Sequence, residues 1–587
     1  MAAFVWDERF AGAARPFLQA LATALAVVVV RSIYRGVRVR LRYKRLARQG
    51  IPIMPHSWLF GHIPLVARFR REFPSDLHIS HFQLELNNNH QKYFPGLKAP
   101  PPVTYLDVWP LADPICLTLD PAIPPQYTQT KSLPKAEMVR YFMRPLCDDR
   151  DLVTLEGNEW KLWRSRFNPG FSARNIMALV PTILEEVDVF VRQLEQLSGP
   201  GGSWGNVFQL EKKAMNLTFD VIGRAALDIK FNEQSRAEPG LFKNAFFSQL
   251  SLMVVGASIN SMVSRRLPSY ARKKAKNAEI MDAYLIPYVQ EREAVVKDQT
   301  ANNSASKASE KIIIDLALQS IEKDGESDQL RSQPGGPLMQ TLLAQLKVFL
   351  FAGHDTTAST IAFGFHLLSK NPECLAKLRA EHDSVFGATA ADIQSTRAQI
   401  EASPQLLNQL PYTTAVIKET LRIHPPAASW RQGQPGFFLS VPGSDIPHPT
   451  EGFMILDATR SVQQRPGAWE RAGEFVPERF LATTEAGKQQ DVEIQAPPAS
   501  GWRPFEHGPR NCIGQELAMT QLRLVLALVA RRFDIECAWD KWDALQGRTG
   551  GATAKNSYNG ERLYAYGEST AHCKDNMPAH VRLRDLP

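Results

Sequence analysis

The chain is poor in cysteine and lacks the signatures of several common enzyme classes. Its 587 residues include six cysteines, none of them in a Cys-x-x-Cys pair, so neither a disulfide scaffold nor a zinc ribbon fits. No Gly-x-Gly-x-x-Gly follows a predicted strand, and neither a phosphate loop ending in Gly-Lys-Ser/Thr nor a Gly-x-Ser-x-Gly elbow is present. Binding of a flavin or a nicotinamide therefore has no support in the sequence, and a mostly reduced, cytosol-facing protein is expected.

The charge is balanced everywhere except in one short segment. The net formal charge is +8, and the stretch from Arg31 to Arg48 holds eight basic residues and no acidic one. This segment accounts for the whole excess, so the basic composition does not indicate a nucleic-acid surface. Basic residues directly after an apolar run are typical of a membrane-proximal segment.

The apolar run before this cluster predicts an N-terminal membrane anchor. Phe17 to Val30 contains no charged residue, and extension back to Phe10 gives a nearly spanning stretch in which Arg15 can reach the headgroups. By the positive-inside rule, the chain after Arg31 stays in the cytoplasm. We expect residues 1–49 to form a single-pass anchor, with an interfacial helix lying on the membrane as the alternative.

The remaining residues, 50–587, are expected to form one catalytic domain. Proline and glycine between Gly50 and Pro64 predict a stiff hinge. Beyond it the hydrophobic spacing is mainly helical, as from Ile176 to Leu197, with short strands near 103–108, 437–441 and 580–583. The polar segments 298–310 and 325–337 are predicted loops flanking a short helix. The fold class expected is mainly α with small peripheral β-sheets.

One cysteine lies in a glycine-bounded loop directly before a predicted helix. The loop reads Phe505-Glu-His-Gly-Pro-Arg-Asn-Cys-Ile-Gly514, and apolar residues at helical spacing follow it. Gly508 and Gly514 permit tight turns, and Cys512 would lie at a helix N-terminus, where a thiolate is stabilised. This arrangement suits a thiolate ligand of haem iron, with Arg510 paired to a haem propionate and Phe505 shielding the sulfur.

A long apolar helix predicted from Pro337 to Ser369 has polar residues at its centre, in Ala352-Gly-His-Asp-Thr-Thr357. Gly353 would leave room for a ligand, and the Thr356 hydroxyl can bond the carbonyl of Ala352. Asp355 supplies an exchangeable proton. An acid beside an alcohol is what stepwise proton delivery requires, whereas His354 is interpreted as a helix-packing or pocket-edge residue rather than a metal ligand.

These segments together resemble the cytochrome P450 family. The loop matches its haem-binding signature Phe-x-x-Gly-x-Arg-x-Cys-x-Gly, and the central helix is similar to its oxygen-activating helix. The resemblance extends to three further segments in the family's order, namely Trp160 to Arg164, Glu419 to Arg422 and Phe475 to Phe480. It therefore spans nearly all of the chain after the hinge.

The resemblance implies roles for these residues. Cys512 would bind the iron of haem b, and Trp160 and Arg164 would donate to a propionate, with Arg431 as a further donor. Glu419, Arg422 and Arg479 would form a buried charge network that locks the cysteine loop. By family position, the walls of the substrate pocket would include Val348, Ala352, Ala427 and Ala428.

The activity implied is a monooxygenase that inserts one atom of O2 into a lipophilic substrate. Electrons would come from NADPH-cytochrome P450 reductase, with cytochrome b5 as an additional donor, and the anchor would place the chain in the endoplasmic reticulum membrane. Several stretches look most like fungal enzymes of secondary metabolism; a fatty-acid or alkane hydroxylase is one alternative. A haem-thiolate isomerase or dehydratase that does not use O2, or a haem-binding sensor, would not need the pair Asp355 and Thr356.

Overall fold

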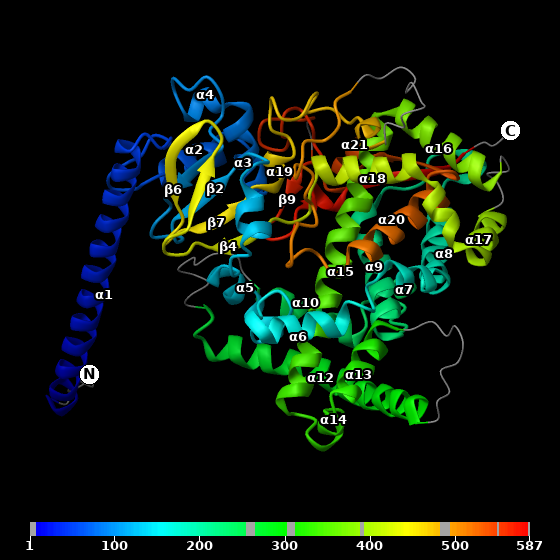
Figure 1. Cartoon of the computed structure of the whole chain (residues 1–587), viewed down its shortest axis with the longest axis horizontal. Helices are drawn as coiled ribbons and strands as arrows, with labels where there is room; N and C mark the ends of the chain where they lie inside the picture. The colour runs from blue at the N-terminus through cyan, green and yellow to red at the C-terminus, as the bar shows by residue number, and fades with distance from the viewer. Residues whose placement is uncertain are drawn as a thin grey trace, which may run out of the picture.

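The computed structural model describes residues 8–253, 264–301, 312–387, 393–481, 494–548 and 551–584. Most of the body is helical, as expected (Figure 1). The helices are α1 Glu8–Arg48, α2 Ile63–Glu72, α3 Ile79–Asn88, α4 His90–Tyr93, α5 Glu137–Cys147, α6 Gly157–Phe167, α7 Ala173–Ala178, α8 Val180–Leu197, α9 Leu210–Leu227, α10 Leu241–Leu250, α12 Pro268–Ala301, α13 Ile313–Lys323, α14 Asp328–Ser332, α15 Pro337–Lys370, α16 Pro372–Phe386, α17 Ile393–Ala402, α18 Pro411–Ile423, α19 Thr459–Val462, α20 Gln515–Val529 and α21 Trp539–Leu545.

In the part of the chain that the structure describes, four small sheets lie against the helical body. The largest has the strand order β1-β2-β7-β4, with β2 and β7 parallel and the other pairs antiparallel. The others are β3-β11-β8, β5-β6 and the hairpin β9-β10. The strand bounds are β1 Val103–Leu106, β2 Ile115–Thr118, β3 Phe208–Gln209, β4 Trp430–Gln432, β5 Phe438–Val441, β6 Ser444–Pro449, β7 Met454–Asp457, β8 Phe533–Cys537, β9 Ala565–Tyr566, β10 His572–Cys573 and β11 Pro578–Leu583.

Three local expectations differ from the structure. The stretch from Ile176 to Leu197 is two helices, since α7 ends at Ala178 and α8 begins at Val180. Of the predicted loop 298–310, residues 298–301 continue α12, and the rest lies outside the described residues. The predicted loop 325–337 contains the short helix α14, whose only buried residue is Leu330. For the two predicted loops, local polarity outweighed weaker helical signals in the sequence.

Helix α1 is a long rod at one side of the molecule (Figure 1). Its C-terminal part packs on the body: Tyr43 and Leu46 are buried, and Arg40 forms a buried ion pair with Asp107. Earlier in the helix, Leu25 and Val30 are more than half exposed. Among the described residues, no helix has both the length and the apolar character that crossing a membrane requires. The predicted spanning anchor is therefore not confirmed.

Helix α15 runs through the middle of the helical body, beside α9, α18 and α20 (Figure 1). A Cβ added at Gly353 would approach Ile222 Cγ1 of α9 to 2.9 Å. Gly353 therefore allows the two helices to pack closely, and the interpretation that it leaves room for a ligand is wrong. The neighbouring His354 is fully buried against Phe219 and Phe247, as its predicted packing role requires.

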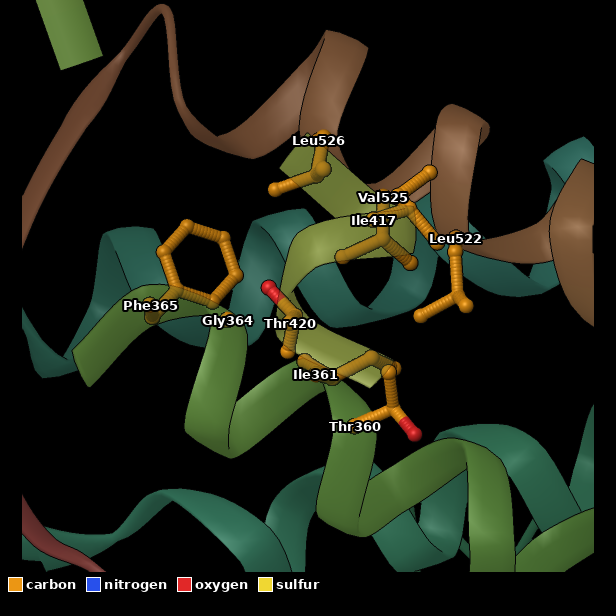
Figure 2. Close-up of a pocket in the computed structure, with 9 residues that line it drawn as sticks. All are labelled: Thr360, Ile361, Gly364, Phe365, Ile417, Thr420, Leu522, Val525 and Leu526. Carbon is orange, nitrogen blue, oxygen red and sulfur yellow. The ribbon is translucent and has the colours of Figure 1, made fainter. Parts of the chain in front are cut away.

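A small apolar cavity lies where α15, α18 and α20 meet (Figure 2). Its volume is about 10 Å³, and side chains such as Ile361, Ile417 and Leu522 line it. This is roughly the space of a single water. It is far too small for an organic substrate, so the packing between these helices is close to complete and the functional site must lie elsewhere.

Candidate functional site

The cysteine loop ends where α20 begins, as the sequence predicts. Gly514 is the N-cap of α20, and the Cys512 N–H donates to the Phe505 carbonyl at 2.8 Å, which closes the loop on itself. Cys512 is exposed, while Leu517 and Met519 in the helix that follows are buried. The fold therefore presents the sulfur on an open face at the edge of a packed core.

The two glycines of the loop serve different purposes. Gly508 has φ +92°, and a Cβ there would approach the carbonyl oxygen of Thr128 to 2.1 Å. Only glycine fits this position. Gly514 has φ −86°, so a left-handed turn is not its reason; a Cβ there would lie 4.0 Å from the Cys512 sulfur.

The protein alone does not favour the Cys512 thiolate. Although the Cys512 side chain is exposed on one face, the protein packed behind it desolvates the sulfur and raises the pKa of the thiol, whereas the Gly514 N–H and the Arg164 guanidinium lower it. The expected stabilisation by the helix N-terminus is present but is outweighed by desolvation. A bound metal would have to complete the deprotonation.

Four cationic side chains surround this loop. Arg164 of α6 donates to the Asn511 carbonyl and to Asn511 Oδ1, at 2.9 and 3.0 Å, and so holds the backbone next to Cys512. Arg510 pairs with a carboxylate oxygen of Glu156 at 2.6 Å, and its guanidinium lies 4.7 Å from the centre of the Trp160 ring. Each side chain therefore already has protein partners.

The other two cations share one carboxylate. Arg431 forms an ion pair with Glu506, and Lys135 Nζ lies 3.3 Å from the same carboxylate. Burial lowers the pKa of Lys135 to about 8. Sequence reasoning missed Lys135, Glu156 and Glu506 as neighbours of the site, although Glu506 stands inside the quoted loop with a φ of +57°.

This charge balance fits haem. Four cations, Lys135, Arg164, Arg431 and Arg510, face two carboxylates, Glu156 and Glu506, so the protein carries two uncompensated positive charges beside an exposed sulfur ligand. A haem has two propionates and an iron that binds thiolate. The residues present thus match the group's charge and its ligand chemistry, with Trp160, Arg164, Arg431 and Arg510 as the candidate propionate partners.

The central turn of α15 exposes a small part of its surface. Ala352 is exposed and Thr356 is half-buried, whereas Val348, one turn earlier, is 3% exposed and belongs to the hydrophobic core. Thr356 Oγ1 donates to the Ala352 carbonyl at 2.9 Å, the predicted back-bond. After α18, Ala427 and Ala428 are also exposed. Three of the four candidate pocket residues therefore present open apolar surface.

Asp355 faces away from this open surface. Its carboxylate is largely buried, and Oδ1 lies 3.4 Å from Nε2 of His572, on the C-terminal hairpin. The other nitrogen of that ring, Nδ1, lies 3.0 Å from Oε1 of Glu211 in α9. Sequence reasoning missed both His572 and Glu211, since neither stands in a recognisable motif and both lie far from Asp355 along the chain.

The structure contains the predicted charge network of Glu419, Arg422 and Arg479. Glu419 Oε2 accepts from Arg422 Nε at 2.7 Å, and Glu419 Oε1 accepts from Arg479 Nε at 3.1 Å; all three side chains are fully buried. The Val476 N–H also donates to Glu419, at 2.8 Å. Arg422 donates further to the carbonyls of Gln463, Ala472 and Glu474. The network therefore ties α18 to the segment that leads to the cysteine loop.

Comparison with known proteins extends this agreement beyond single residues. The family model for cytochrome P450 matches residues 123–558. A cytochrome P450 monooxygenase, polC, of Polytolypa hystricis is 36% identical over 577 residues, which cover 97% of each chain. The cytochrome P450 monooxygenase acrF of Aspergillus aculeatus is 32% identical over 505 residues, or 82% of this chain and 94% of the relative.

Solved structures share the architecture. The crystal structure of the cytochrome P450DA heme domain superimposes with a TM-score of 0.63 and 18% sequence identity, over 91% of this chain and 98% of that one. At this identity the likeness concerns the fold. Since it covers 91% of this chain, it concerns the fold of nearly the whole chain.

Proposed function

Because the chain belongs to the cytochrome P450 family, we propose that it is a haem-thiolate monooxygenase that inserts one oxygen atom of O2 into a lipophilic substrate, by hydroxylation, epoxidation or a related oxidation. The observation that carries this proposal is the exposed Cys512 at the N-terminus of α20, surrounded by two uncompensated positive charges. The exposed alanines of α15 and of the segment after α18 support an apolar substrate.

Haem b is the proposed cofactor, and when bound it would supply the electron transfer and oxygen activation that amino-acid side chains cannot. Cys512 would be its iron ligand. Arg164, Arg431 and Arg510 would hold its propionates, with Trp160 packed against Arg510. Since these arginines already contact the loop and its neighbours, their positions are set before the cofactor arrives.

The proposed proton path uses α15. The Thr356 hydroxyl donates its hydrogen bond to the Ala352 carbonyl. Its oxygen lone pairs remain free to accept a hydrogen bond from a donor on the open face. Asp355, one residue earlier, can exchange a proton but is turned into the protein. This acid and alcohol favour a monooxygenase over an isomerase or a dehydratase that does not use O2, because such enzymes do not need this pair.

The iron ligand is tested by the spectrum of the reduced protein with carbon monoxide. The wild type should show the red-shifted Soret band of thiolate ligation, and Cys512→His should lose it. A wild-type band at the position of histidine-ligated haem would refute the assignment.

Oxygen chemistry is tested separately. Thr356→Ala should still bind haem and substrate but should divert NADPH into hydrogen peroxide, because protons would arrive out of order. Product formed per NADPH is the quantity to measure. Unchanged coupling would favour the isomerase or dehydratase instead.

The partners proposed are NADPH-cytochrome P450 reductase and, as an additional donor, cytochrome b5. Similarity to two fungal monooxygenases supports a role in fungal secondary metabolism, with fatty-acid or alkane hydroxylation as the alternative. We assign residues 50–587 to the catalytic domain. Turnover with purified reductase against panels of terpenoids, polyketides and fatty acids would separate the substrate classes.

We also propose that residues 1–49 attach the chain to the endoplasmic reticulum membrane, with the catalytic domain in the cytoplasm. The exposed apolar side chains from Leu25 to Val30 and the basic residues after them support this attachment. Extraction from membranes would show whether this segment spans the membrane or lies on its surface. Resistance to alkaline carbonate would indicate a span, and release by high salt would indicate a helix lying on the surface.

A further inference from the structure

A histidine of the C-terminal hairpin lies between two carboxylates, one of which is Asp355. His572 Nδ1 is 3.0 Å from Glu211 Oε1, and His572 Nε2 is 3.4 Å from Asp355 Oδ1. The Glu211 side chain is fully buried and that of Asp355 is 9% exposed, whereas the His572 side chain is 21% exposed. Of these three groups, His572 is therefore the most accessible to solvent.

The hairpin is held rigidly in place. The backbone N–H of Cys573 donates to Glu211 Oε2 at 2.9 Å, so Glu211 fixes both the ring and the strand that carries it. At the turn, the Ala571 N–H donates to the Pro426 carbonyl at 2.9 Å, directly before the exposed Ala427. The histidine is thus attached to the same part of the molecule as the open apolar surface.

The other ionisable groups around His572 do not compete with the two carboxylates. His354 of α15 and His78, before α3, both have pKa values lowered by burial, to about 4 for His78, so both are neutral near pH 7. Tyr566 of β9 has a pKa raised to about 12 and is neutral as well. The local field at the imidazole is therefore set by Glu211 and Asp355.

Burial lowers the pKa of His572, but the hydrogen bond to Glu211 and the charge of Asp355 outweigh it and raise the pKa to about 9. Burial raises the pKa of Glu211, and the neighbouring imidazolium opposes that rise. The geometry gives the same direction, because protonation adds a second N–H, on Nε2 facing Asp355, and places a positive charge between two carboxylates.

From this arrangement we infer that His572 is the positioning and proton-exchange partner of Asp355: held by Glu211, it returns to Asp355 the proton that Asp355 delivers toward Thr356 and the open face of α15. The inference rests on the proposed role of Asp355 and Thr356. It adds two residues, from α9 and β10, to the machinery.

The exchange balances as a proton transfer with no redox change. When Asp355 has given up its proton, the Nε2–H bond of the imidazolium breaks and an O–H bond forms at Asp355 Oδ1. The neutral ring keeps its Nδ1–H, which Glu211 accepts. A solvent proton then binds Nε2 through the exposed part of the ring and restores the imidazolium. Glu211 holds one tautomer throughout and never needs access to solvent.

The simpler alternative is that the imidazolium is a fixed counter-charge that only holds Asp355 in place. The two differ in one respect: an exchange partner must lose and regain its proton, while a fixed counter-charge need not. His572→Arg separates them, because arginine keeps the positive charge but does not release a proton in this pH range.

The first experiment does not depend on turnover. Histidine C2 hydrogen–deuterium exchange, followed by mass spectrometry across pH in the purified holoenzyme, gives the pKa of His572. We expect a value near 9 in the wild type and a fall of about one to three pH units in Asp355→Asn. A wild-type value at or below the ordinary 6.5, or no change in Asp355→Asn, would overturn the inference.

The second experiment measures product per NADPH against pH. Wild-type coupling should fall as the pH rises through about 9, and His572→Gln should be poorly coupled at all pH values. The matched control is His580→Gln, a histidine of β11 that stacks on Trp204 and should behave as the wild type. Full coupling in His572→Gln, or full rescue in His572→Arg, would refute proton exchange.

The same assay distinguishes this inference from the proposed function. If Asp355→Asn is uncoupled while His572→Gln is not, the relay is wrong and the role of Asp355 stands. If neither variant is uncoupled, the proposed role of Asp355 fails, and the inference fails with it.

Discussion

Replacing Glu419 by glutamine removes the single negative charge of the buried network below the cysteine loop. The carboxylate accepts from Arg422 through both of its oxygens, at 2.7 and 2.9 Å, from Arg479 at 3.1 Å and from the Val476 N–H at 2.8 Å. Glutamine has nearly the same shape. It offers one oxygen, however, and its NH2 group would face an N–H donor where the carboxylate has an acceptor.

The expected loss of stability in Glu419→Gln follows from the burial of the network. Arg422 and Arg479 have fully buried side chains, so their charges would lose their counter-charge without gaining water. Breaking a buried ion pair by removing one partner costs about 3–5 kcal/mol. Bonds from Arg422 to the carbonyls of Gln463 and Ala472 survive the change, so we expect the lower part of this range, about 3 kcal/mol.

The assay is urea unfolding of wild type and variant, followed by circular dichroism and by tryptophan fluorescence. Arg471→Gln is the matched control, because Arg471 pairs with Glu474 in the same segment at 2.6 Å with side chains 45% and 58% exposed. An exposed pair contributes at most about 1 kcal/mol. If Glu419→Gln costs no more than Arg471→Gln, the network is not what stabilises this part of the fold.

Three further predictions use other parts of the structure. Gly508→Ala should abolish the thiolate spectrum, because its Cβ would overlap the Thr128 carbonyl. The control is Gly547→Ala, with φ +64° and no atom within 4 Å of the added Cβ, which should cost only about 1 kcal/mol of backbone strain and leave the spectrum intact. Equal effects of the two substitutions would contradict the overlap. Gly364→Ala, whose Cβ would lie 3.8 Å from the nearest side chain beside the small cavity (Figure 2), should raise the free energy of unfolding by about 0.5–1 kcal/mol, because alanine favours the helix over glycine. A lower free energy of unfolding would show that the added methyl group does not fit beside the cavity. Because the pKa of His572 is raised from 6.5 to about 9, its ion pairs should stabilise the fold fully below pH 6.5, and this stabilisation should be lost as the pH rises through about 9. Over this interval the free energy of unfolding should fall by about 3 kcal/mol more in the wild type than in His572→Gln. Parallel curves of unfolding free energy against pH would refute the raised pKa.

The elements nearest Cys512 could be predicted from local sequence. The cysteine loop, the N-terminus of α20 and the length of α15 all follow from glycine positions and helical spacing over short stretches. The back-bond from Thr356 to Ala352 spans a single helical turn, as does the pair of Glu419 with Arg422. Interactions over three or four residues depend on helix geometry alone, so the sequence is sufficient to predict them.

Other features could not be predicted because they depend on contacts between distant segments. The sequence suggests that Gly353 leaves room for a ligand, but the structure places Ile222 of α9 against it, and only the crossing of two helices shows this. The sequence predicts cofactor contacts for Arg510 and Arg431, and the structure shows that Glu156 and Glu506 also contact them. The N-terminal run suggested a span, yet no described helix has the length and apolar character required.

The motifs of this protein and its family can be read from the sequence: a cysteine before a helix, and an acid beside an alcohol in a long apolar helix. The electrostatic surroundings of those groups depend on the folded chain. Asp355 and His572 are 217 residues apart, and Glu211 joins them from a third segment. The physical reason is that motifs act through bonds and turns of a few residues, while buried charges take their partners from whichever segments the packing of the core brings within a few ångströms.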